Sequence, residues 1–123
     1  MGCEDSAERP RSIEAVVHAG GAATPYVRAG EGEVVVLLRA VPCAVIAGSP
    51  FFLRMAARRR VIGVTAPPGA DVRWLRDLIE GLGLDRPELM GERRLARLLL
   101  EFAEAHPERA SWVTLLDEEA EAA

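Results

Sequence analysis

A run of five aliphatic residues at 34–38 (VVVLL) restricts the possible folds of this chain more than any other feature. A strand with one face in water alternates apolar and polar side chains. An unbroken run of β-branched and aliphatic residues is instead typical of a strand buried on both faces of a parallel sheet. We therefore predict that residues 34–38 form the central strand. Such a strand needs helices on both faces of its sheet, which indicates an α/β domain.

The segments on either side of this run alternate between strand and helix patterns. Strand patterns are found at 12–18, 24–28, 61–65, 88–91 and 111–116, and helix patterns at 50–60, 72–82 and 95–106. Gly20 and Gly21 predict a turn, so the first two strands are expected to form an antiparallel hairpin. The order of the remaining elements predicts a mostly parallel sheet with helices on both faces.

Composition indicates one folded domain. Half of the 123 residues are hydrophobic and 28% are charged, an ordinary balance for a globular protein. We expect residues 1–11 to be a disordered polar start, residues 12–116 to be the domain, and residues 117–123 to be an acidic tail. The abundance of Ala, Arg and Gly, with no Lys, Asn or Gln, indicates a GC-rich bacterial genome.

Several classes of function are disfavoured at this stage. The net charge of −4 argues against general nucleic-acid binding. The apolar stretches are too short and too interrupted to span a membrane, and no secretory signal is evident. The two cysteines, Cys3 and Cys43, form neither a disulfide framework nor a metal-ligand pattern. A cytoplasmic protein without metal or cofactor is therefore expected.

Several segments, in the correct order, resemble the α/β-hydrolases. Residues 26–38 are similar to the second and third strands of that family. Residues 74–87 (WLRDLIEGLGLDRP) are similar to the helix and turn before its nucleophile strand, and residues 88–90 to the strand itself. Residues 106–109 (HPER) are similar to a later helix end. The resemblance covers nearly the whole chain and implies a truncated α/β-hydrolase-like three-layer sandwich, the N-terminal half of the family's fold.

The family's catalytic residues are replaced or absent. Where the family has G-x-S-x-G, residues 91–95 read GERRL, so Arg93 holds the position of the nucleophile, which a guanidinium cannot be. Residues 39–43 (RAVPC) stand where the family has a His-Gly-x-Pro-Gly loop that supplies an amide to the oxyanion hole. The family's acid and histidine lie beyond the strand at 111–116. The resemblance therefore implies a pseudoenzyme.

Four charged residues are expected to meet at the carboxyl ends of the central strands, where open α/β sheets bind ligands. Arg39 follows the strand at 34–38, while Glu92, Arg93 and Arg94 follow the strand at 88–91. These residues are candidates for binding a small anionic ligand through its carboxylate or phosphate. Solvated arginines, or a pair between Glu92 and Arg39, are the alternatives.

Cys43 is the remaining candidate for a catalytic residue. We expect it in a loop at the ligand-binding edge, beside arginines that favour a thiolate. A small buried thiol that fills a glycine position is the alternative. His18 and His106 are expected to be structural, and Trp74 and Trp112 to be packing residues.

Together these features predict a noncatalytic binding or assembly module. A sheet that ends at residues 111–116 presents a free strand edge, so the expected partner is a second copy in a homodimer, or a complementary chain. The alternatives are one half of a split α/β-hydrolase, an enzyme that uses Cys43 in altered chemistry, and a degenerate product without a selected role.

Overall fold

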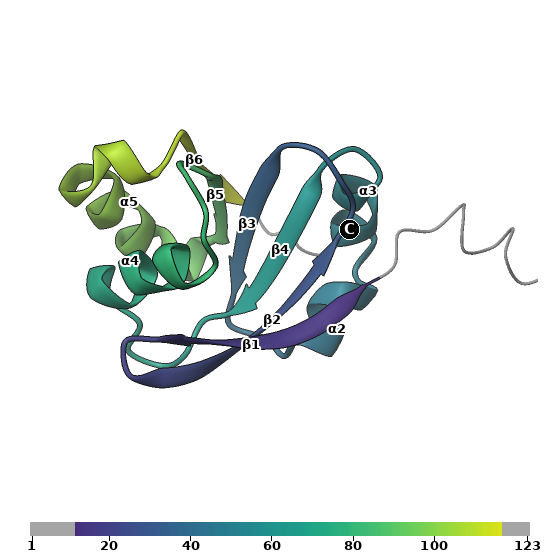
Figure 1. Ribbon diagram of the computed structural model, residues 1–123, viewed down its shortest axis with the longest axis horizontal. Helices are drawn as coiled ribbons and strands as arrows, with labels where there is room; N and C mark the ends of the chain where they lie inside the picture. The colour runs from purple at the N-terminus through teal and green to yellow at the C-terminus, as the bar shows by residue number, and fades with distance from the viewer. Residues whose placement is uncertain (1–11, 117–123) are drawn as a thin grey trace, which may run out of the picture.

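Six strands form one mixed sheet in the order β1-β2-β4-β3-β5-β6 (Figure 1). The computed structural model describes residues 12–116, so the predicted polar start and acidic tail lie outside the described residues. The strands are β1 (Ile13–Ala19), β2 (Ala22–Ala29), β3 (Val34–Arg39), β4 (Arg60–Thr65), β5 (Glu88–Glu92) and β6 (Trp112–Leu116). β1 and β2 form an antiparallel hairpin, and β2 is antiparallel to β4. β4, β3, β5 and β6 are parallel, which confirms the predicted mostly parallel sheet with an N-terminal hairpin.

β3 lies inside the sheet and is buried on both faces, as its composition predicts. Val35, Val36, Leu37 and Leu38 are each at most 1% exposed. Because side chains alternate along a strand, Val36 and Leu38 join the apolar cluster on one face, and Val35 and Leu37 the cluster on the other. Burial of each side chain contributes about 1.5–3 kcal/mol, which favours β3 as the centre of the fold.

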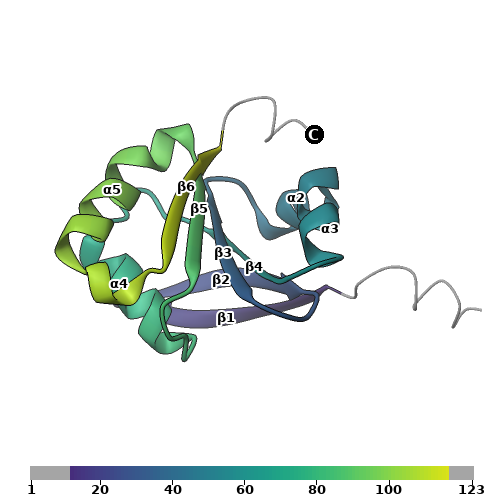
Figure 2. The ribbon, with the colours of Figure 1, turned by 90° about the horizontal axis from the view of Figure 1, so that it is seen from above.

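Helices cover the two faces of the sheet unequally (Figure 2). α4 (Val72–Gly81) and α5 (Ala96–Ala105) lie on one face, and the short helices α2 (Cys43–Gly48) and α3 (Pro50–Ala56) lie on the other. The 3₁₀ turns η1 (Arg93–Leu95) and η2 (Pro107–Arg109) flank α5. Every layer of the predicted sandwich is therefore present, but the α2–α3 layer is much the smaller.

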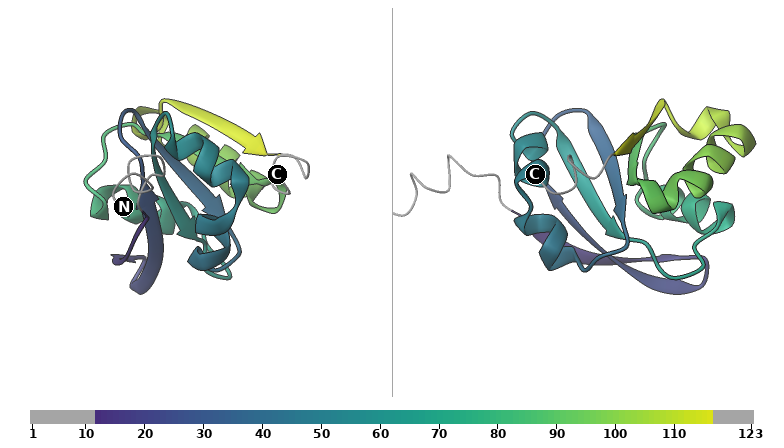
Figure 3. Two further views of the ribbon diagram at one scale, coloured as in Figure 1. Left: turned by 90° about the vertical axis from the view of Figure 1, so that its right-hand side faces the viewer. Right: turned by 180° about the vertical axis from the view of Figure 1, so that it is seen from behind.

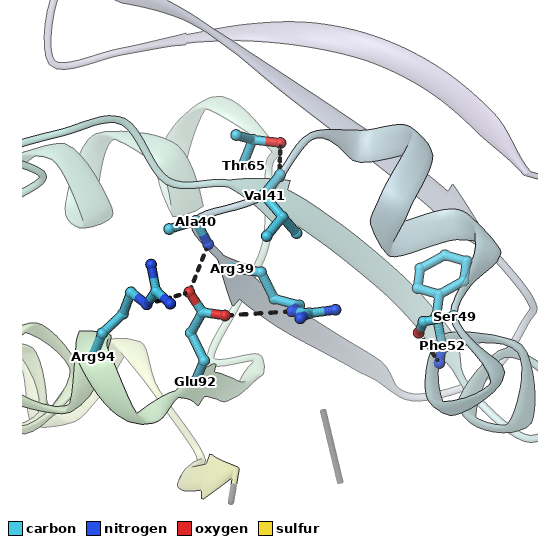
Figure 4. Close-up of polar contacts among 8 residues, drawn as sticks. All are labelled: Arg39, Ala40, Val41, Ser49, Phe52, Thr65, Glu92 and Arg94. Atoms are coloured by element: carbon cyan, nitrogen blue, oxygen red, sulfur yellow. Dashed lines mark hydrogen bonds and ion pairs between the residues drawn. The ribbon is translucent and has the colours of Figure 1, made fainter. Parts of the chain in front are cut away.

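The predicted helix starts are confirmed. The Ser49 side chain accepts a hydrogen bond from the Phe52 amide at 3.0 Å and so caps α3, with Pro50 in its first turn (Figure 4). Asp71 accepts from the Trp74 amide at 2.9 Å and caps α4. Gly83, with φ of +69°, follows α4 in the left-handed conformation that glycine adopts without strain.

The structure corrects three details of the sequence-based prediction. Cys43 is not in a loop but in the first turn of α2, a helix too short for its apolar period to be read from the sequence. α3 ends at Ala56, so Arg60 is not at a helix end and instead begins β4, paired with Val34 of β3. Trp112 is not packed but 68% exposed, because it lies on an edge strand of the sheet.

Candidate functional site

The carboxyl ends of β3 and β5 form the crevice where a ligand is expected in this topology. The two strands are neighbours in the sheet, but the chain leaves them toward opposite faces. β3 leads to α2, whereas β5 leads through η1 to α5 (Figure 2). Connections that diverge in this way open a crevice at the strand ends, the usual ligand position in open α/β sheets.

Glu92, the last residue of β5, fills this crevice with a buried carboxylate (Figure 4). The residue is 2% exposed. Its Oε1 accepts the Ala40 amide at 2.9 Å and lies 3.3 Å from Arg94 Nε, and its Oε2 lies 3.4 Å from Arg39 Nε. Removing a carboxylate from water costs several kcal/mol, and these three donors compensate for that cost. The pair between Glu92 and Arg39, one of the sequence-based alternatives, is present.

The three predicted arginines differ in their surroundings. The side chain of Arg39 is 13% exposed and that of Arg94 is 71% exposed, so Arg94 reaches from the cluster toward solvent. Arg93 is exposed, and within residues 12–116 its side chain makes no ion pair or hydrogen bond. Arg39, Glu92 and Arg94 therefore come together, and Arg93 stays apart.

The turn after β5 lacks the strain of a nucleophile elbow, which is a sharp turn from strand to helix. Arg86 is the one non-glycine residue with positive φ in the described chain, so Arg93 has an ordinary backbone. Arg93 opens η1, and α5 begins only at Ala96. Gly91 keeps a packing role, because a Cβ there would lie 2.5 Å from Leu99 Cδ1 of α5.

A groove of about 620 Å³ lies beside the Glu92 cluster. Its apolar lining comes from the loop after β3, the loop after β4, and the start of α5: Val41, Pro42, Pro67, Pro68, Leu95 and Leu98. Charged side chains of Arg94, Arg97, Asp71 and Glu101 also line it. Arg97 Nε lies 3.3 Å from Glu101 Oε2. The groove therefore has an apolar lining that could hold the apolar part of a ligand, with arginine side chains at one side.

Cys43 lies close to this groove but is 7% exposed. Its Sγ lies 3.4 Å from Thr65 Oγ1, which itself donates to the Val41 carbonyl at 2.8 Å. His18 is on β1, and His106 follows α5 with its ring 5.2 Å from the Phe102 ring. Neither histidine contacts Cys43 among the described residues, so the thiol has the surroundings of a packing residue.

Two further properties concern the described part of the chain. No group of His, Cys, Asp or Glu side chains between residues 12 and 116 is arranged to hold a metal ion. None of the helices in this part is long and apolar enough to cross a membrane.

No protein-family model matches the sequence, and no curated protein sequence matches it. Solved structures do match. A haloalkane dehalogenase from Agrobacterium tumefaciens superposes with a TM-score of 0.68 at 20% identity, over 85% of this chain and 40% of the dehalogenase. A carboxylesterase from Bacillus subtilis superposes with a TM-score of 0.71 at 18% identity, over 86% of this chain and 43% of the esterase. The chain has the α/β-hydrolase fold.

A third structure also superposes, with a TM-score of 0.71 at 19% identity over 86% of this chain and 46% of the other protein. It is the 2-hydroxy-6-oxo-6-phenylhexa-2,4-dienoate hydrolase from a Rhodococcus species. The chain thus spans less than half the length of these α/β-hydrolase-fold structures. Similarity at this level of identity establishes the fold, and function has to be argued from the site.

Proposed function

We propose that this α/β-hydrolase-fold domain is a noncatalytic binding module that holds a small anionic ligand with an apolar body at the carboxyl ends of β3 and β5. One observation carries the proposal. A carboxylate of the chain itself, on Glu92, already occupies the crevice, where it accepts hydrogen bonds from the Ala40 amide and from Arg39 and is ion-paired with Arg94. The crevice therefore has the chemistry that stabilises a carboxylate.

The same contacts disfavour hydrolysis. By resemblance, the loop of Ala40 supplies an amide to the oxyanion hole, but here the Ala40 amide is already donated to Glu92. An oxyanion at this position would therefore lack the free amide donor that it needs. Arg93, at the position of the family's nucleophile, cannot attack a carbonyl. Two independent requirements for acyl transfer are therefore missing at this site.

Arg94 is the residue best placed to meet an external anion. Within the described chain its side chain is ion-paired with Glu92 at 3.3 Å and is 71% exposed, so the solvent-facing part of the guanidinium can meet a second carboxylate. The adjacent groove of about 620 Å³ is in the range of small-molecule sites. Pro67 and Leu98 line it with apolar surface. An aromatic monocarboxylate matches both parts of the site.

Isothermal titration calorimetry with phenylacetate and its neutral analogue phenylacetamide tests the proposal. Phenylacetate is expected to bind, and Arg94→Gln to weaken it about tenfold, the loss of one charge-assisted contact. Arg60→Gln is the matched control, because Arg60 is an exposed arginine at the amino end of β4. Equal binding of the acid and the amide, or equal effects of the two variants, would refute the proposal.

A second role, in assembly, is supported by the exposed edge of the sheet. β6 is one of the two edge strands of the sheet (Figure 3), and it carries Trp112 and Leu115 at 68% and 41% exposure. Free strand edges pair readily with other strands, so we propose a symmetric homodimer through β6. Light scattering is expected to detect a dimer that the double variant Trp112→Ser, Leu115→Ser converts to a monomer. A wild-type protein that is monomeric throughout the micromolar range contradicts this role.

A further inference from the structure

A second groove, separate from the ligand crevice, is lined by residues of α3, of the turn that follows it, and of β5. α3 lies on the thinly covered face of the sheet (Figure 2). α5 packs on β5 and β6 from the opposite face, whereas α3 packs mainly on β4. The groove has a volume of about 570 Å³ and an apolar floor of Phe51, Met55 and Met90, all partly exposed. The sheet surface beside α3 is therefore open along β5.

The charges around this floor have one predominant sign. Arg54, Arg58 and Arg59 line the groove, and Arg59 is paired with Glu88 of β5. Arg54 and Arg58 are exposed, and neither is ion-paired within residues 12–116. Two cations that lack an acidic partner among the described residues thus flank an apolar floor with two methionines. The flexible side chains of methionine adapt to the shape of a bound partner.

We propose that this groove docks an amphipathic helix of a partner protein, with large apolar side chains on one face and carboxylates beside them. The apolar face packs on Met55 and Met90, and the carboxylates pair with Arg54 and Arg58. This is the groove mode of helix recognition, in which apolar anchors supply affinity and charges on the rim supply selectivity.

A partner fits the groove better than the chain's own C-terminal segment does. Residues 117–123 (DEEAEAA) contain four carboxylates, but alanine is their largest apolar side chain. Methyl groups bury too little apolar surface to fill a groove of about 570 Å³. The occupant therefore needs both leucine-sized side chains and carboxylates.

Fluorescence anisotropy with two labelled peptides tests the proposal. One peptide carries leucines on one helical face and glutamates on both flanks, and its matched control has lysine at every glutamate position. The wild-type protein is expected to bind the glutamate peptide about tenfold more tightly than the lysine peptide. The glutamate peptide gains two partly screened ion pairs with the arginines, whereas the lysine peptide is repelled by both of them. Binding should shift the Met55 and Met90 methyl resonances and should weaken as salt rises.

The double variant Arg54→Glu, Arg58→Glu should reverse the preference toward the lysine peptide. The double variant Arg73→Glu, Arg76→Glu changes net charge equally, but on α4 at the opposite face, and it should leave the preference unchanged. Equal binding of both peptides by the wild type would overturn the proposal without any variant, as would equal effects of the two double variants.

Tenfold tighter peptide binding after deletion of residues 117–123 would instead assign the groove to that segment. Conversion of a dimer to a monomer by the Arg54, Arg58 variant would assign it to a second copy.

Discussion

Glu92→Ala is expected to destabilise the domain by about 3 kcal/mol, because the carboxylate is the shared acceptor of the ligand crevice. The Ala40 amide loses its acceptor at 2.9 Å, which costs about 1–3 kcal/mol. Arg39, at 13% side-chain exposure, loses an ion pair that solvent only partly replaces, whereas Arg94, at 71%, is hydrated and loses little. The cost of burying the Glu92 carboxylate is removed at the same time, so the net effect stays below that of a fully buried pair.

Urea unfolding followed by far-ultraviolet circular dichroism measures this loss, which corresponds to a fall in Tm of roughly 10–20 °C for a domain of this size. Glu101→Ala is the matched control, because Glu101 is 54% exposed and pairs only with Arg97 in the described chain. It should cost less than about 0.5 kcal/mol. A loss below about 1 kcal/mol for Glu92→Ala, or one equal to that of the control, would refute the assigned role of Glu92.

The same variant connects stability to binding. Without the Glu92 carboxylate, the crevice retains the Ala40 amide, Arg39 and Arg94 but loses the carboxylate that all three contact among the described residues. Acetate should bind there and raise the Tm of Glu92→Ala. At an acetate concentration of about ten times its Kd, the free energy of unfolding should rise by about 1.4 kcal/mol. Chloride at the same ionic strength should have a smaller effect. If acetate and chloride act equally, the crevice does not recognise a carboxylate.

Three further predictions concern single positions. Gly30→Ala should lower the free energy of unfolding in urea by more than about 3 kcal/mol, and Gly69→Ala by about 1 kcal/mol. Both glycines have positive φ, but of the two only Gly30 lies where a Cβ would collide with backbone oxygens. Trp74→Phe should cost about 2 kcal/mol in the same assay, because the buried Thr24 hydroxyl loses the indole donor at 3.2 Å. Arg93→Ser should give no turnover in an ester-substrate assay, and measurable hydrolysis would show that the crevice is not blocked by Glu92.

Local sequence signals were sufficient where the physical cause is local. The run at 34–38 predicted a strand buried on both faces, and β3 has this position. The helix patterns that begin at residues 50 and 72 had the correct starts, and the Ser49 and Asp71 side chains cap these helices by bonding amides three residues away. α2 escaped prediction because six residues between prolines contain too few turns for a helical period.

The sequence predicted a free edge at residues 111–116, but it did not predict which side chains of that strand are exposed. Trp112 and Leu89 are both apolar residues in strands, yet one is 68% exposed and the other fully buried. The difference arises from strand order, because β5 has neighbours on both sides and β6 has one. A residue's own identity does not contain this information.

The resemblance of the sequence to α/β-hydrolases predicted that Arg93 stands at the nucleophile position, and the presence of four charged residues near two strand ends follows from the sequence alone. Which of these charges meet was decided only by the tertiary structure. Glu92 reaches the Ala40 amide and Arg39 across separations of 52 and 53 residues, because the parallel pairing of β3 with β5 brings both strand ends together. The pairing of two strands that are distant in the sequence thus buries Glu92 at the centre of the site, which the sequence alone did not show.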